Sequence, residues 1–154
     1  MKRVRIPQDK ADLLQNLLLN NDNPEGLFDT YADILAFCAS LGKKYNRKIA
    51  LTTIAKEPYP INIDVFYSRG YQPLMELIAI LECETLDDWQ QSNLQKEEIT
   101  VTAFEQYAYG GLTILEEKLQ GSIDYTERVL LILSQEQQVK TKPSEEFDLS
   151  RFLP

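Results

Sequence analysis

The stretch FEQYAYGGLTILEEKL, residues 104–119, is the longest run of the sequence in which apolar residues keep a helical spacing. These residues recur every three or four positions, at Phe104, Tyr107, Ala108, Gly111, Leu112, Leu115 and Leu119. The spacing stacks them on one face and predicts an α-helix from about Thr102 to a terminal cap at Gly121. That face must pack against other parts of the protein.

Gly110 and Gly111 lie in the middle of this predicted helix, where each glycine costs about 1 kcal/mol relative to alanine. Either a backbone or an aromatic ring fills the space left by the missing Cβ, or the glycines contact a ligand. Phosphate-binding loops place their glycines between a strand and a helix with wider spacing, so packing is favoured. We therefore take Tyr107, Gly110 and Gly111 as packing or interface residues. The expected occupant is the helix over 124–133 or a neighbouring subunit.

Four further helices are predicted from capping signals and apolar spacing. The first is capped by Asp9 and runs to about Leu19. The second starts at the capping box of Thr30 and ends at Gly42 as its C-terminal cap. The third has Pro73 in its first turn and buries Leu74, Leu77, Ile78 and Leu81. The fifth starts at Asp124, and its run Val129–Leu133 places it centrally or at a subunit contact.

Extended segments complete a mainly α, five-helix domain over residues 1–135. Arg3 to Ile6 alternate charged and apolar residues, which predicts a short N-terminal strand. Residues 49–54 and 61–66 are candidates for a small extended pair in the middle. Trp89 stands in a polar stretch, where it either folds back onto the core or marks a partner site. Residues 136–154 form a loosely ordered tail, although its apolar end FDLSRFLP either docks in a groove or frays.

Charge is unevenly distributed along the 154 residues, whose formal net charge is −8. Residues 1–56 carry nine Lys/Arg against six Asp/Glu, and the rest of the chain carries seven against eighteen. Two basic clusters are candidate DNA contacts: Lys2, Arg3, Arg5 and Lys10, and Lys43, Lys44, Arg47 and Lys48. The alternative is that both are solvated surface, because an acidic domain is not the usual nucleic-acid binder.

The chain contains no histidine and only two cysteines, Cys38 and Cys83, both within apolar helical patterns. Nucleophilic arrangements that need histidine are therefore excluded, and we expect no metal or cofactor. The cysteine usage and the polar start predict a cytoplasmic protein without a membrane segment. An enzyme would have to rely on carboxylates or lysines, for example as a metal-dependent nuclease. Glu105 is the carboxylate most worth checking for burial, and Arg69 beside Gly70 could bind a carboxylate or phosphate.

The stretches KRVRIPQDKADLL, FDTYADILAFCASLG, IAKEPYPINIDVF with RGY after it, and FEQYAYGGLTILEEKL followed by DYTERVLLIL occur in this order. Together they resemble the DNA phosphorothioation-associated protein 4 family, small bacterial proteins encoded beside Dnd sulfur-modification and restriction genes. The resemblance implies an accessory role in that modification and defence system, with other Dnd proteins as partners. It carries no established functional residue.

The order of elements is also similar, more distantly, to the Dnd component E protein, a helical, ribbon-helix-helix-like subunit that forms tetramers and has been linked to nicked DNA. This likeness implies a homo-oligomer in which Arg3 and Arg5 lie on a strand paired across a dimer, where a two-stranded ribbon can meet DNA. Three readings stay open: a non-enzymatic accessory protein with or without DNA contact, a carboxylate-metal enzyme, and a pure partner-binding module.

Overall fold

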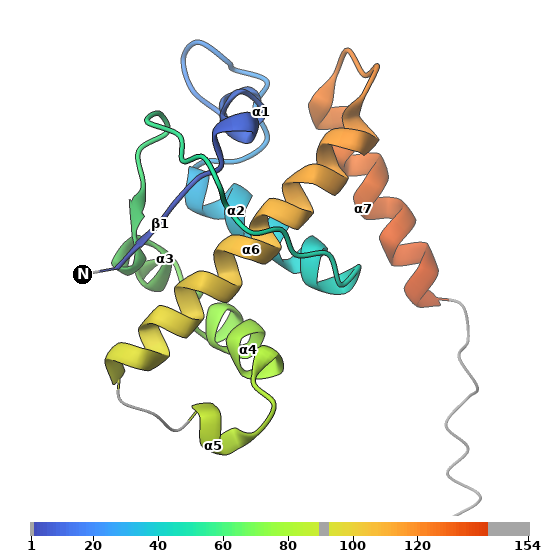
Figure 1. Ribbon diagram of the computed structural model, residues 1–154. Helices are drawn as coiled ribbons and strands as arrows, with labels where there is room; N and C mark the ends of the chain where they lie inside the picture. Colours follow the sequence, from blue (N-terminus) through green and yellow to red (C-terminus); the bar gives the residue numbers. More distant parts are fainter. Residues whose placement is uncertain (1, 90–92, 142–154) are drawn as a thin grey trace, which may run out of the picture.

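Helices dominate the computed structural model, which describes residues 2–89 and 93–141 (Figure 1). The α-helices are α1 (Ala11–Leu17), α2 (Tyr31–Lys44), α3 (Ile63–Ser68), α4 (Gln72–Glu82), α5 (Leu86–Trp89), α6 (Asn93–Leu119) and α7 (Tyr125–Thr141). A 3₁₀ turn, η1 (Gln8–Lys10), precedes α1, and two short strands, β1 (Arg3–Val4) and β2 (Ile61–Asn62), form the sheet. The mainly α expectation is confirmed, with α3 and α5 as additional short helices.

The long helix α6 organises the fold, as its apolar spacing predicted. It runs diagonally across the molecule, and α2, α4 and α7 all pack against it (Figure 1). Phe104, Tyr107, Leu112 and Leu115 on its inner face are at most 1% exposed. It begins at Asn93, nine residues before the predicted start. The added turns are rich in Gln, Lys and Glu, which favour a helix without forming an apolar stripe.

The second helix starts where the sequence predicted but continues past its predicted end. The Asp33 backbone N–H donates to Thr30 Oγ1 at 3.2 Å, which confirms the cap. Gly42 is not the C-terminal cap, because α2 continues to Lys44 and Gly42 is buried inside it. That glycine is needed for packing against α6, as described below.

The sheet joins the N-terminus to the middle of the same chain. β1 pairs with β2 in antiparallel register, with Arg3 opposite Asn62 and Val4 opposite Ile61. The strand expected over 61–66 ends after two residues, because the Asn62 side chain accepts the Asp64 N–H at 3.1 Å and starts α3. Residues 49–54 form no strand and touch the N-terminal segment through an isolated bridge between Pro7 and Ile54.

The predicted starts of α4 and α7 are confirmed, and that of α1 is wrong. Pro73 lies in the first turn of α4, and Asp124 accepts the Glu127 N–H at 3.1 Å. Asp9 instead lies within η1 and makes no capping bond. The Tyr109 hydroxyl donates to its carboxylate at 2.8 Å. Asp9 therefore bonds to a residue 100 positions away in the sequence and does not cap its own helix.

Helix α7 lies at the edge of the molecule rather than at its centre (Figure 1). Val129 and Ile132 are buried, whereas Leu130, Leu131 and Leu133 are 40–54% exposed. On α4, Ile78 is buried as expected, but Leu77 and Leu81 are 54% and 57% exposed. Of the two positions predicted for the fifth helix, the central one is wrong, because only one of its apolar faces meets α6, and the subunit contact stays a prediction.

Candidate functional site

The glycines of α6 lie where two helix backbones cross. A Cβ added to Gly111 would stand 1.6 Å from the carbonyl oxygen of Cys38 in α2, and one added to Gly42 would stand 2.1 Å from that of Tyr107. Only residues without a Cβ allow such an approach. The occupant of the glycine notch is therefore α2, and the expectation that the helix over 124–133 or a neighbouring subunit fills it is wrong.

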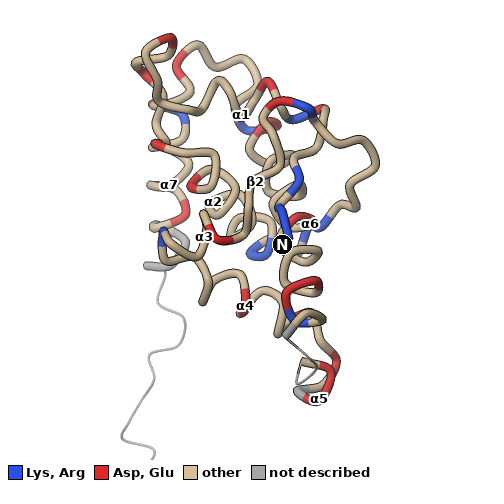
Figure 2. Tube along the Cα trace, turned by 90° about the vertical axis from the view of Figure 1, so that its left-hand side faces the viewer, with Lys and Arg blue, Asp and Glu red and all other residues tan. Residues whose placement is uncertain are grey.

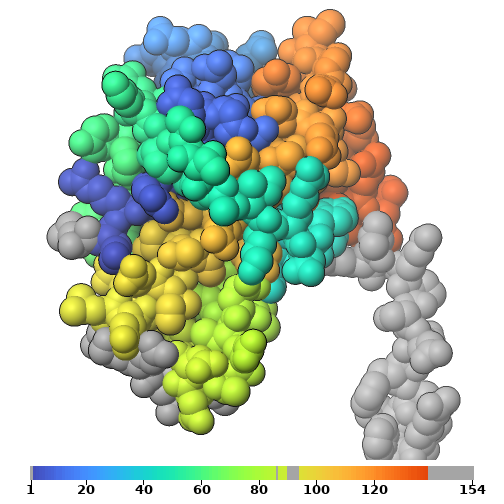
Figure 3. Space-filling model, in the orientation of Figure 1, coloured from blue at the N-terminus to red at the C-terminus, as the bar shows by residue number. Residues whose placement is uncertain are grey.

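The backbone of the segment that follows α2 packs directly against Gly110. A Cβ added to this glycine would stand 1.8 Å from the carbonyl oxygen of Arg47. The Arg47 N–H donates to Gly42 O at 2.8 Å, and the Ile49 N–H donates to Gln106 O at 3.0 Å. In Figure 3 this segment crosses the surface of α6 between its yellow and orange halves. The backbone of Arg47 and Lys48, two residues of the second basic cluster, thus lies directly against the central helix.

The first basic cluster contains a clamp between Arg5 and the buried Glu105 of α6. Glu105 is 3% exposed. It accepts the Arg5 backbone N–H at 2.7 Å and the guanidinium through Nε at 2.9 Å and Nη2 at 3.1 Å. This side-chain hydrogen bonding, with the negative charge of Glu105, raises the pKa of Arg5. The clamp ties the N-terminal segment to the middle of the central helix.

Glu82, at the end of α4, gathers three donors. Lys43 and Lys48 lie 3.3 Å and 2.7 Å from its two carboxylate oxygens, and the Tyr107 hydroxyl also donates to it. Partial burial alone would raise the pKa of Glu82, but the hydrogen bonds from Lys48, Tyr107 and Lys43 outweigh it and lower the pKa to about 2. The carboxylate therefore joins α4, α2 and α6 as an anion.

This lowered pKa predicts a pH-dependent contribution of Glu82 to stability. A carboxyl whose pKa is lower in the folded than in the unfolded chain stabilises the fold above the unfolded value, near 4.5, and this contribution fades as pH falls towards 2. Because Glu82 is partly solvated, we expect about 2 kcal/mol at pH 7. The difference in unfolding free energy between wild type and Glu82→Gln, measured with urea, should be smallest near pH 2, grow up to about pH 4.5 and stay constant above it. A difference that does not change between pH 2 and pH 5 would contradict the prediction.

The remaining candidate DNA contacts also have partners within the chain. Lys10 is buried and lies 3.2 Å from Glu116, and Arg47 lies 3.1 Å from Glu117. Lys44 pairs with Glu136 of α7, and Lys2 lies 3.7 Å from Glu98. Arg3 instead lies over the ring of Tyr59, 5.7 Å from its centroid. Figure 2 shows the basic positions of both clusters near α6, with acidic positions among them.

Arg69 binds a carboxylate, as its position beside a glycine turn suggested, and the carboxylate is that of Asp33. Its Nε and Nη2 donate to the two Asp33 oxygens at 2.9 and 2.7 Å, and the Tyr71 hydroxyl donates to one of them. Burial would raise the pKa of Asp33, but hydrogen bonds from Arg69, Tyr71 and Thr30 lower it. This pair fixes the start of α4 against the start of α2.

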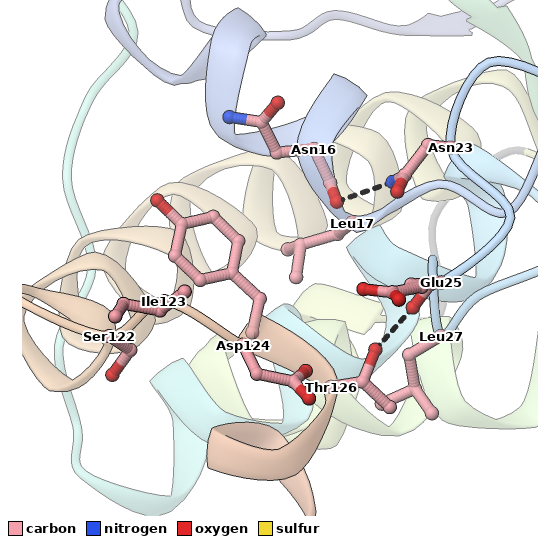
Figure 4. A pocket seen from close by; sticks show the side chains of 10 residues that line it. Asn16, Leu17, Asn23, Glu25, Leu27, Ser122, Ile123, Asp124 and Thr126 are labelled. Atoms are coloured by element: carbon pink, nitrogen blue, oxygen red, sulfur yellow. Dashed lines mark hydrogen bonds between the residues drawn. The ribbon is translucent and has the colours of Figure 1, made fainter.

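A polar pocket of about 300 Å³ lies between the end of α1 and the turn from α6 to α7 (Figure 4). Its polar groups largely bind one another: Asn23 Nδ2 donates to Asn16 O at 2.8 Å, and the Thr126 hydroxyl donates to Glu25 O. The charged side chains that line it are the carboxylates of Glu25 and Asp124. An anionic ligand such as a phosphate would be repelled here.

Trp89 is partly buried and packs against the core, and Lys96 Nζ lies 5.8 Å from its ring. Within residues 2–89 and 93–141, no three His, Cys, Asp or Glu side chains approach closely enough to hold a metal ion. In the same residues, no helix is long and apolar enough to cross a membrane.

These features define a small, acidic, mainly α-helical protein in which the side chains of the two basic clusters contact carboxylates of the same chain or, for Arg3, a tyrosine ring. The model of one family, DNA sulphur modification system-associated protein 4, matches residues 3–152. The chain belongs to this family, so the resemblance found in the sequence is confirmed. No curated protein and no solved structure matches significantly. The likeness to component E stays a prediction.

Proposed function

We propose that this protein is a non-enzymatic accessory subunit of a bacterial DNA phosphorothioation modification and restriction system, and that it acts through protein contacts. Family membership supports the system. The observation that carries the protein-contact part is the pairing of the two basic clusters: within the described residues, all of their side chains except Arg3 lie within 4 Å of a carboxylate of the same chain.

Electrostatics support protein contact over DNA contact. DNA binding gains most of its non-specific free energy when free Lys and Arg side chains neutralise phosphates. Here a phosphate would have to displace carboxylates that are tethered beside the cations, and it would approach a chain of net charge −8. Among the residues of the two clusters, Lys2 and Arg3 have the longest contacts with their partners. A test of DNA contact should therefore use substitutions of these two residues.

The proposal predicts that the affinity-tagged full chain retains other proteins of the modification system. The tagged chain should be expressed in a host that carries these genes and purified after nuclease treatment. We expect Dnd proteins to co-elute in stable ratio. A host without the modification genes provides the background control. Failure to retain any Dnd protein, or retention that disappears with nuclease treatment, would contradict the proposal.

A further inference from the structure

An apolar groove runs along the outer face of α2. Most of α2 is buried, and its outward stripe consists of Asp33, Phe37, Ser40 and Lys44, spaced three or four residues apart. Together with Phe28, Ala36, Tyr71 and Leu74, part of this stripe lines a cavity of about 310 Å³. Phe28 and Phe37 form its aromatic floor, with ring centroids 5.6 Å apart.

Helix α4 forms one wall of the groove and runs in the same direction as α2. Its beginning is fixed by the bonds from Arg69 and Tyr71 to Asp33, and its end by the pair of Glu82 and Lys43. Leu77 and Leu81 lie on the same flank of α4 as the groove-lining Leu74, three and seven residues further on. Their exposure of 54% and 57% leaves this wall apolar and uncovered.

Helix α7 is bonded to residues before and after α2, and none of its residues lines the cavity itself. Near its start the Thr126 hydroxyl bonds Glu25 O ahead of α2, and near its end Glu136 bonds Lys44 and Tyr45. The helix is therefore attached beside α2 at both ends. Leu130 and Leu133 lie four and seven residues after Thr126, on the same flank, and are 54% and 40% exposed.

We infer that this groove is the binding site of the chain's own C-terminal segment, residues 147–154, FDLSRFLP. Four of these eight residues, Phe147, Leu149, Phe152 and Leu153, are large and apolar. An apolar groove flanked by charged ends needs an apolar occupant. Because the segment belongs to the same chain, its effective concentration at the groove is about millimolar. This favours its binding over that of a free partner.

Chain length allows this docking. The described part of α7 ends at Thr141, five residues after Glu136, which lies at the Lys44 end of the groove. The six steps from Thr141 to Phe147 can span up to about 20 Å. The outward stripe of α2 from Asp33 to Lys44 is about 17 Å long at the helical rise. The segment can therefore enter at the Lys44 end and follow the groove towards Asp33.

A spin label placed in the segment tests this docking in the full chain. Ser150→Cys, in a Cys83→Ser background, carries the label, since the remaining Cys38 is buried. In methyl NMR spectra, we expect the spin label to remove most of the signal intensity of Leu74, Leu130 and Leu133. The signals of Leu94 and Ile123 should keep their intensity. Leu94 and Ile123 serve as internal controls because they are exposed but lie outside the groove. Equal broadening at all five residues, or none, would overturn the inference.

Variants and mixed samples separate the occupants of the groove. Leu77→Gln/Leu81→Gln should restore the methyl intensity, whereas the matched exposed substitution Leu94→Gln should leave the broadening unchanged. If broadening survives Leu77→Gln/Leu81→Gln, the groove is not the site. Mixing isotope-labelled chains with unlabelled, spin-labelled chains should give no broadening. Broadening in that mixture would instead assign the groove to the tail of a second copy.

Discussion

Gly111→Leu should unfold this protein or reduce its free energy of unfolding by about 4 kcal/mol or more, the upper range for a single substitution. The first side-chain carbon would stand 1.6 Å from the Cys38 carbonyl oxygen, and that obstacle is backbone rather than a flexible side chain. Replacing a helical glycine would gain about 1 kcal/mol of helix propensity, which the overlap exceeds. To make room for the leucine side chain, α2 and α6 must move apart where their backbones approach most closely.

Circular dichroism during urea unfolding measures this effect. Thr102→Leu is the matched control, because it adds the same side chain to the same helix at an exposed position. It should change stability by less than about 0.5 kcal/mol. A Gly111→Leu variant as stable as Thr102→Leu would show that the two backbones do not approach as described.

Arg5→Ala should cost about 3 kcal/mol, the lower end of the range for removing one partner of a buried ion pair, because Arg5 itself is half exposed. The substitution removes the guanidinium that donates twice to the Glu105 carboxylate, which is 3% exposed. The buried carboxylate then keeps only the backbone N–H of residue 5, which compensates part of its desolvation cost. Arg5 itself is half exposed, so the opposite substitution, Glu105→Gln, leaves a cation that water can reach and should cost less.

A double-mutant cycle isolates this pair. Arg5→Ala/Glu105→Gln removes the stranded charge and should be more stable than Arg5→Ala alone. Equal stability of Arg5→Ala and wild type would contradict the clamp. Arg3→Ala is the matched control, because it removes a neighbouring arginine that lies over a tyrosine ring, 5.7 Å from its centroid. Any DNA-binding assay that uses Arg5→Ala therefore needs a check of folding first.

Local chemistry made several parts of the fold predictable. Thr30, Pro73 and Asp124 start their helices as expected, since a capping side chain or a proline acts within one turn. The apolar face of residues 104–119 also revealed the central helix. Residues 63–66 show the limit of such reasoning, because their alternation fits a strand while the Asn62 cap makes them helical.

Contacts between distant residues were not predictable from spacing alone. Gly42 has the signature of a helix end, but α6 needs its missing Cβ. Arg5 and Glu105 are 100 residues apart, as are Asp9 and Tyr109, and no local pattern links them. Glu105 was predictable as a candidate because aromatic residues surround it in the sequence, whereas nothing near Glu82 in the sequence marks a carboxylate with three donors. The apolar tail, residues 147–154, lies outside the described residues.

Titration of a fluorescent DNA duplex with the full chain at low salt shows most directly whether the basic clusters serve the fold or bind DNA. Phosphorothioated and unmodified duplexes should both be used. We predict no saturable polarisation change up to about 10⁻⁴ M protein, the weak end of non-specific binding. Micromolar binding that weakens steeply with added salt and is lost in a folded Lys2→Ala/Arg3→Ala variant would contradict the conclusion that the clusters serve the fold.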